Sequence, residues 1–77
     1  MRDWLVDLRK GLGLTLREMG EKIGVSESYY LMIEQGKRQR TMDITLISRI
    51  AAVSKKSEAK ILKMEKEYLN GKENAPR

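Results

Sequence analysis

The only proline of this 77-residue chain is Pro76, and no stretch alternates β-branched with polar residues. Because proline is the strongest helix breaker and alternation marks strands, their absence leaves helix as the expected structure almost throughout. Glycines and Ser or Thr residues divide the chain into segments of helical length. The sequence therefore predicts an all-α fold of five short helices in one domain over residues 1–69, followed by a polar, disordered tail over 70–77.

Local signals place the first two helices. Leucines recur at helical spacing after Asp3, a candidate N-cap, so we expect a first helix near 3–11. The tetrapeptide Thr15-Leu16-Arg17-Glu18 fits a capping box, in which the hydroxyl and the carboxylate each bind a backbone amide that has no partner at a helix start. A second helix is expected from there to about Ile23.

The boundaries of the other helices are marked in the same way, by a glycine that can end a helix or by a hydroxyl or carboxylate residue that can cap one. These residues are Gly24 and Ser26 before a third helix over 27–35, Gly36 after it, Thr41 and Asp43 before a fourth helix, and Ser57 before a fifth. These boundary residues thus support five helices, and the chain shows no internal repeat.

The composition argues against catalysis. The chain has no Cys and no His, which removes thiolate nucleophiles, imidazole bases and the usual zinc ligands. The best pairs of carboxylates, Glu18 with Glu21 and Glu65 with Glu67, lie on helix faces that we expect to be solvated. We therefore predict no enzyme activity, no catalytic residue, no metal and no cofactor, and no small-molecule ligand is evident.

No segment is typical of secretion or membrane insertion. Charged residues interrupt the first apolar stretch, and the longest apolar run, Ile50-Ala51-Ala52-Val53, is far shorter than the roughly 20 residues that a bilayer crossing requires. We therefore expect a cytoplasmic protein without a membrane partner.

Positive charge is concentrated in the second half of the chain. Residues 1–34 carry one more acidic than basic side chain, whereas residues 35–77 carry six more basic than acidic ones. The densest stretch, Lys37-Arg38-Gln39-Arg40, predicts contact with a polyanion, with a merely solvated loop as the alternative. A second basic group, from Lys55 to Lys66, is interleaved with Glu residues and is more typical of a solvated helix face.

Residues 16–35 have the pattern of two helices packed across a tight turn. Gly24 supplies the turn, and Gly20 offers a surface without a side chain where two helices can cross closely. The apolar positions expected to face the core are Met19, Ile23, Val25, Tyr30 and Ile33. The pattern predicts a helix-turn-helix, with an ordinary helical hairpin as the alternative.

Once its apolar side chains face the core, the third helix has a second face that is expected to be exposed. The first residues on that face are polar. Such a helix fits the major groove of B-DNA, where its first residues reach base edges. Glu27 can accept from a cytosine amino group, Ser28 can bond to more than one base, Met32 can contact a thymine methyl group, and Tyr29 can reach a base or a phosphate. We predict these four residues as the base-reading set, although Glu27 could instead stabilise the helix dipole.

Phosphate contacts are expected on both flanks of that helix. Amides at the start of the second helix, near Leu16 and Arg17, form an anion site because they have no helical partners. On the other flank, Lys37, Arg38 and Arg40 follow the reading helix in the basic loop. Contacts of this kind fix the register of a DNA-binding protein and supply most of its affinity.

The segments Gly13-Leu14-Thr15, Gly24-Val25-Ser26 and Ile33-Glu34-Gln35-Gly36-Lys37-Arg38 resemble the Cro and phage-repressor type of helix-turn-helix, the XRE family, over about residues 5–62. The resemblance implies a compact five-helix bundle of the lambda-repressor-like type. It also implies a transcriptional regulator, most often a repressor, that binds double-stranded DNA as a homodimer on a palindromic operator. The Ser28-Tyr29-Tyr30 variant is similar to members from phages and mobile elements.

The resemblance also implies roles for individual residues. The reading positions of the family fall on Glu27, Ser28 and Met32. A family ion pair between the first helix and the end of the third falls on Arg9 and Glu34, where bidentate arginine geometry would hold the reading helix in place. Two separate surface charges are the alternative for this pair.

Three positions depart from the pattern of the family. Leu16 stands where the family commonly has a Gln that touches phosphate, so that contact cannot come from this side chain. Gly20 replaces the usual Ala, at a cost in helix stability of roughly 1 kcal/mol. Lys55-Lys56 stands where Gly-Val is expected between the last two helices.

Two apolar features admit other interpretations. Leu31 and Met32 beside Leu16 could form an exposed patch, which would suit a protein-binding adaptor such as an anti-repressor or an antitoxin-like partner. On the last helix, the candidate dimer contacts are Ile61, Met64, Tyr68 and Leu69. These four side chains could equally pack against Trp4 and Leu8 of the same chain.

Overall fold

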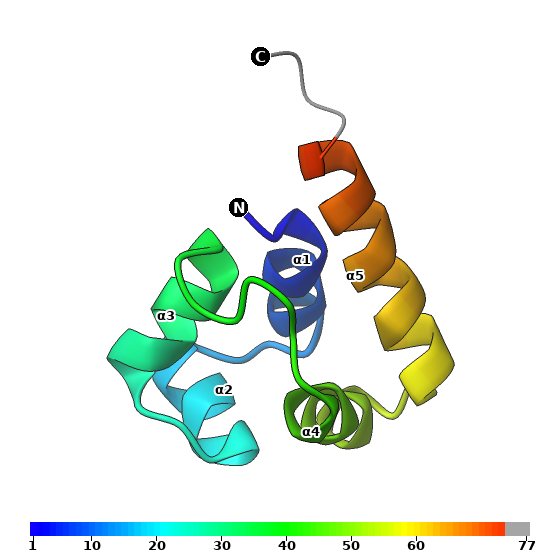
Figure 1. Ribbon diagram of the computed structural model, residues 1–77. Helices are drawn as coiled ribbons and strands as arrows, with labels where there is room; N and C mark the ends of the chain where they lie inside the picture. Colours follow the sequence, from blue (N-terminus) through cyan, green and yellow to red (C-terminus); the bar gives the residue numbers. More distant parts are fainter. Residues whose placement is uncertain (74–77) are drawn as a thin grey trace.

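The computed structural model describes residues 1–73, which form five α-helices around one core (Figure 1). The helices are α1 (Asp3–Gly11), α2 (Leu16–Ile23), α3 (Glu27–Gln35), α4 (Ile44–Ser54) and α5 (Glu58–Glu73). Residues 1–73 contain no strand, so the predictions of an all-α fold and of five helices are confirmed. The bounds expected for the first and third helices are those observed.

The C-terminal boundary differs from the expectation. Helix α5 continues through Asn70 to Glu73, so the predicted tail over 70–77 begins inside a helix. No helix breaker follows Tyr68 before Pro76 except Gly71, and extending an existing helix costs far less than starting one. Residues 74–77 lie outside the described part of the chain.

Side-chain caps begin the middle helices as their sequences predict. At α2, the Thr15 hydroxyl accepts from the Glu18 amide at 3.1 Å, and the Glu18 carboxylate accepts from the Thr15 amide at 2.9 Å. Ser26 caps α3 and Asp43 caps α4 through their side-chain oxygens. These bonds satisfy amides that the helices themselves leave without partners.

The expected N-cap of the first helix is wrong by one residue. Asp3 is not the N-cap but the first residue of α1, and the N-cap position belongs to Arg2, whose side chain makes no capping bond. The carboxylate of Asp3 instead lies in the first turn, where it complements the positive end of the helix dipole. The side chain of Arg2 is instead buried, and it donates to Glu65 and to the carbonyl of Ile33.

The core takes apolar side chains from all five helices. The fully buried ones are Leu5 of α1, Met19 and Ile23 of α2, Tyr30 and Ile33 of α3, Ile50 of α4 and Ile61 of α5. Val25 packs on the edge of this cluster. In Figure 1, α1 lies between α3 and α5, and α4 closes the bundle beside α2. The α2–α3 pair therefore forms one side of the molecule and α5 the opposite side.

Helices α2 and α3 approach each other most closely at Gly20. A Cβ at this position would lie 2.9 Å from the carbonyl oxygen of Val25 and 3.3 Å from that of Ser26. Both oxygens belong to the backbone of the turn, which cannot move away as a flexible side chain could. The turn itself needs Gly24, whose φ of 80° is left-handed.

Replacing Gly20 with leucine is expected to lower the free energy of unfolding by about 1–3 kcal/mol, because the new side chain must push the two helices apart. Urea unfolding followed by circular dichroism measures the change. Gly11→Leu is the matched control, since a Cβ at Gly11 meets nothing within 4 Å, and it should shift stability by less than about 0.5 kcal/mol. Equal losses in both variants would contradict the close crossing.

Candidate nucleic-acid interface

Helix α3 presents its N-terminal end to solvent. Its buried side consists of Tyr30, Ile33 and Glu34. These three residues lie on one face, because each residue of an α-helix is rotated by about 100° from the one before it. On the other side, Glu27 and Ser28 are exposed, and Leu31, Met32 and Gln35 are half-buried. In the described part of the chain, α5 lies away from this face. The predicted reading residues Glu27, Ser28 and Met32 are thus brought to one accessible side.

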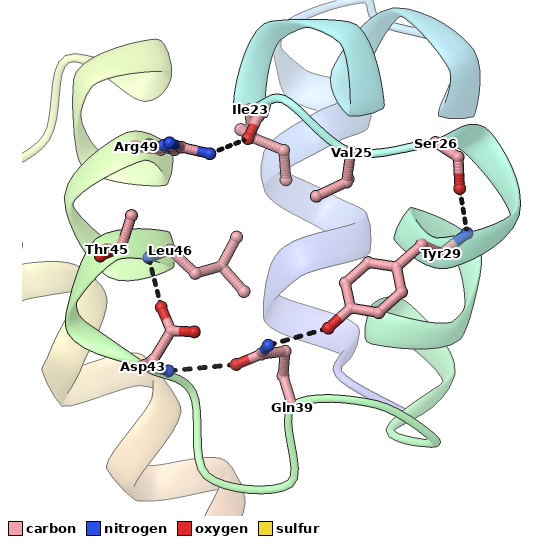
Figure 2. A pocket seen from close by; sticks show the side chains of 9 residues that line it. All are labelled: Ile23, Val25, Ser26, Tyr29, Gln39, Asp43, Thr45, Leu46 and Arg49. Carbon is pink, nitrogen blue, oxygen red and sulfur yellow. Dashed lines mark hydrogen bonds between the residues drawn. The ribbon is translucent and has the colours of Figure 1, made fainter.

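Tyr29 lies apart from these three. Its ring lines a hollow between the α2–α3 turn and α4, and its hydroxyl accepts a hydrogen bond of 2.9 Å from the side-chain amide of Gln39 (Figure 2). The physical reason is rotation along the helix, since Tyr29 lies closer in angle to the buried Ile33 than Ser28 does. The structure therefore aims Tyr29 at the basic loop rather than along the row of reading residues.

The ion pair implied by the resemblance is formed. The Arg9 Nε donates to the Glu34 carboxylate at 2.7 Å, and Arg9 Nη1 donates to the carbonyl of Leu14 at 2.9 Å. Both side chains are largely buried, with 13% of Arg9 and 3% of Glu34 exposed. The hydrogen bond to Glu34 raises the pKa of Arg9, so the guanidinium keeps its charge. The pair ties α1 to the end of α3 and to the segment that leads into α2.

The start of α2 retains two backbone amides for an anion. The capping box uses the amides of Thr15 and Glu18, and within residues 1–73 no acceptor is bonded to the amides of Leu16 and Arg17. Hydrogen bonds from Thr15 lower the pKa of the Glu18 carboxyl. The Leu16 side chain packs against the core, so its predicted phosphate contact rests on the amide alone.

The loop after α3 carries exposed cations. Lys37, Arg38 and Arg40 are all exposed, and none of them has an acidic partner among the ion pairs of the described residues. The loop begins at Gly36, whose φ is 78°, and passes through Gln39, whose φ is 55°. Along the chain, the free amides of α2 precede α3 and these cations follow it.

Two residues that shape this surface were not singled out by sequence reasoning. Gln39 bonds to Tyr29 and also accepts from the amide of Asp43 at 3.2 Å, which joins the loop to the start of α4 (Figure 2). Arg49 of α4 donates to the carbonyl of Ile23 at 3.1 Å and so caps the end of α2. The bonds to Tyr29 and Ile23 have no local signal, because they span 10 and 26 positions of sequence.

The α2–α3 pair, the tight turn at Gly24 and the accessible first turn of α3 define the class of the molecule as a helix-turn-helix DNA-binding domain. The model of the family described as Helix-turn-helix matches residues 5–61. This chain therefore belongs to that family, in its XRE or Cro and phage-repressor type, and is a DNA-binding regulator. The family is a non-enzymatic one.

Comparisons with curated proteins and with solved structures find no match. Across residues 1–73, no helix combines the length and the apolar character that crossing a membrane requires.

Proposed function

We propose that the chain is a sequence-specific repressor that reads the major groove of double-stranded DNA with α3. The observation that carries the proposal is the exposure of Glu27 and Ser28 at the start of α3, with the free amides of α2 before them in the chain and the cations of the loop at 36–40 after them. A helix that enters the major groove presents its first residues to base edges while both flanks hold phosphates. The likeness of Ser28-Tyr29-Tyr30 to phage and mobile-element members supports an origin of that kind.

Each residue then has a chemical role. Glu27 accepts from a cytosine amino group, Ser28 donates to or accepts from a base edge, and Met32 contacts a thymine methyl group. The amides of Leu16 and Arg17 bind one phosphate, and Lys37, Arg38 and Arg40 bind others. Tyr29 keeps its hydroxyl proton for a phosphate, because its oxygen is the acceptor in the bond from Gln39.

The test is a salt series with a duplex of random sequence, followed by selection of bound sequences from a random pool. A protein that neutralises phosphates must lose affinity linearly in the logarithm of the salt concentration, because condensed counterions are released on binding. Selection should then enrich a palindrome. A flat salt response would overturn the proposal and would favour a protein-binding adaptor instead.

Replacing Ser28 with alanine or Glu27 with glutamine is expected to change which sequence is preferred. Losing a base contact should cost on the order of 1–3 kcal/mol against the selected sequence and almost nothing against unrelated sequences. Competition between the selected duplex and a scrambled one, measured by fluorescence anisotropy, gives this ratio. If both variants lost affinity for the two duplexes equally, α3 would not be the reading helix.

We further infer that two copies act together on the palindrome. One small module buries only roughly 600–1,000 Å² on DNA, and a second copy one helical turn away adds affinity and reads the second half-site. On α5, Ile61 is fully buried in its own chain, which leaves the half-buried Met64, Tyr68 and Leu69 as candidate contacts.

We expect analytical ultracentrifugation to find two protomers on each selected duplex. Both half-sites must be intact for this result, because each copy reads one of them. The control is a duplex with one half-site scrambled, which should hold a single protomer under the same conditions. One protomer on the intact palindrome would contradict the dimer.

A further inference from the structure

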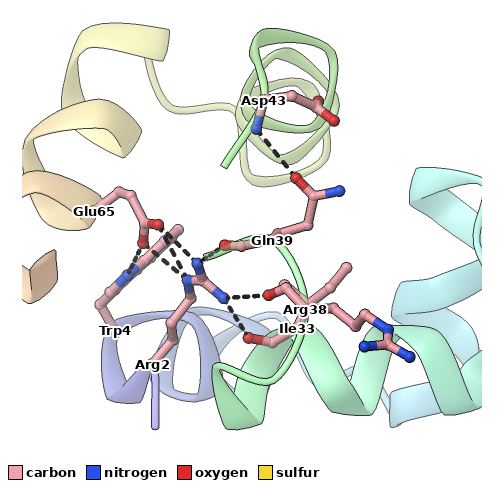
Figure 3. A network of polar contacts seen from close by, with 7 residues as sticks. All are labelled: Arg2, Trp4, Ile33, Arg38, Gln39, Asp43 and Glu65. Carbon is pink, nitrogen blue, oxygen red and sulfur yellow. Dashed lines mark hydrogen bonds and ion pairs between the residues drawn. The ribbon is translucent and has the colours of Figure 1, made fainter. Parts of the chain in front are cut away.

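The side chain of Arg2 is fully buried at the place where the N-terminus, the end of α3 and α5 meet (Figure 3). An arginine with no exposed surface is rare unless all its donors are matched. Glu65 of α5, of which 2% is exposed, is its acidic partner, with Arg2 Nη2 2.9 Å from the Glu65 carboxylate. The indole of Trp4 also donates to Glu65, at 3.2 Å.

The remaining donors of Arg2 bind the backbone that carries the basic loop. Nη1 donates to the carbonyls of Ile33 at 2.6 Å and of Arg38 at 3.1 Å, and Nη2 donates to the carbonyl of Gln39. With Nε and Nη2 bonded to Glu65, each of the five N–H groups of the guanidinium has an acceptor. One buried cation thus joins α5 to three carbonyls between residues 33 and 39.

Within residues 1–73 no backbone amide is bonded to the carbonyls of Arg38 and Gln39, whereas the carbonyl of Ile33 also accepts from the Gly36 amide at 3.1 Å. The last carbonyls of a helix have no intrahelical donor, and a cation is favourable at that end of the helix dipole. At the end of α3, the Arg2 backbone amide binds the carbonyl of Glu34 at 2.7 Å while the guanidinium binds that of Ile33. Tyr68 of α5 completes the enclosure, with its ring 5.2 Å from the Arg2 guanidinium carbon.

The loop is also held at its far end. Gln39 has the left-handed φ of 55°, which is costly for a residue with a side chain and persists only where neighbouring groups enforce it. Its carbonyl is bound by Arg2, and its side chain is bound by the Tyr29 hydroxyl and the Asp43 amide. The backbone from 36 to 40 is therefore anchored at both ends, whereas the side chains of Lys37, Arg38 and Arg40 remain exposed.

We propose that Arg2, fixed by Glu65, is a positioning residue for DNA binding that holds the loop at 36–40 in the conformation its cations need to meet phosphates. The inference rests on the proposed function. A loop that is already ordered does not have to lose conformational freedom when DNA binds, so its contacts contribute more to affinity. Lysine cannot take this place, since an ammonium has three donors and no planar fork.

The test compares the affinities of several variants for a random-sequence duplex at low salt. Glu65→Gln and Glu67→Gln each remove one negative charge from α5, but Glu67 is exposed and does not touch Arg2. Charge alone predicts that both bind DNA as tightly as the wild type or more tightly. Positioning predicts the opposite sign for Glu65→Gln, with Kd raised about threefold to tenfold, the range expected from ordering side chains on binding.

Arg2→Lys changes no net charge and should weaken binding by a similar factor. Because both residues act through one assembly, the double variant should be little weaker than either single variant. Circular dichroism selects a temperature at which every variant is fully folded, and Glu65→Gln, which is nearly isosteric, provides the test if Arg2→Lys does not fold. In the free protein, loss of the pair lowers the stability of the whole fold and also frees the loop, so amide hydrogen exchange at 37–40 should accelerate by a larger factor than exchange in α2 and the first turn of α3.

The outcomes separate the two proposals. If wild type shows no salt-dependent DNA binding, the proposed function is wrong and this inference falls with it. If wild type binds and the Glu65→Gln and Arg2→Lys variants bind as tightly, only the inference is overturned. Exchange at 37–40 that accelerates no more than exchange in α2 would also overturn it, because the pair would then stabilise the whole fold rather than position the loop.

Discussion

Replacing Lys37, Arg38 and Arg40 together with alanine is expected to weaken binding to every duplex about a hundredfold near physiological salt. Each phosphate contact adds about 0.9 to the slope of log K against log salt, which amounts to roughly fivefold in affinity at that ionic strength. All three side chains are exposed and have no acidic partner in the described residues, so their whole charge is available to DNA.

The measurement is a titration of duplex at several salt concentrations. The variant should show a slope shallower by about three units, with loss of affinity for selected and scrambled duplexes alike. The matched control replaces the exposed Lys60, Lys63 and Lys66 of α5, which removes the same charge from another element. If the two triple variants lost the same affinity, only the net charge would matter and the basic loop would not be a contact.

The second large effect concerns the stability of the fold. Replacing Arg9 with alanine should lower the free energy of unfolding by about 3–5 kcal/mol, the usual cost of leaving a buried charge without its partner. Glu34, of which 3% is exposed, would retain its carboxylate in the interior with no guanidinium beside it. For a domain of this size that loss is a large part of the total stability.

Urea unfolding measures this change. Two controls test whether burial of the pair is its cause. Arg17→Ala breaks an ion pair whose partners are 77% and 67% exposed, so it should cost at most about 1 kcal/mol. Adding Glu34→Gln to Arg9→Ala should recover part of the loss, because the stranded charge is then removed. If Arg9→Ala cost no more than Arg17→Ala, the Arg9 pair would not stabilise the end of α3.

Much of the fold could be predicted because its signals are local. The capping box of Thr15 and Glu18 is complete within four residues, and the glycines at 24 and 36 adopt the left-handed conformations that end their helices. The apolar spacing of α2 and α3 likewise specifies which sides face the core. The helix-turn-helix is therefore predictable from short segments whose local preferences agree with the fold.

The N-cap of α1 and the direction of Tyr29 are two features in which distant groups outweigh a local signal. Asp3 has the chemistry of an N-cap, but the N-cap position of α1 belongs to Arg2, which bonds to α3 and α5. Tyr29 lies apart from the other predicted reading residues, and its hydroxyl oxygen accepts from Gln39, ten positions away. Such outcomes depend on which segments pack together, and no periodicity in the sequence reports that.

The sequence by itself determined the helices, the N-caps of α2 to α5, the turn between α2 and α3 and the cations that follow the reading helix, since these depend on residues a few positions apart. Only the tertiary structure decided how the basic loop is held. Arg2 binds Glu65 across 63 positions of sequence and binds Ile33 across 31, and those groups meet only after α1 packs between α3 and α5. A buried guanidinium is stable only when each of its donors finds an acceptor, and that requirement is met by the assembled bundle and not by any segment alone.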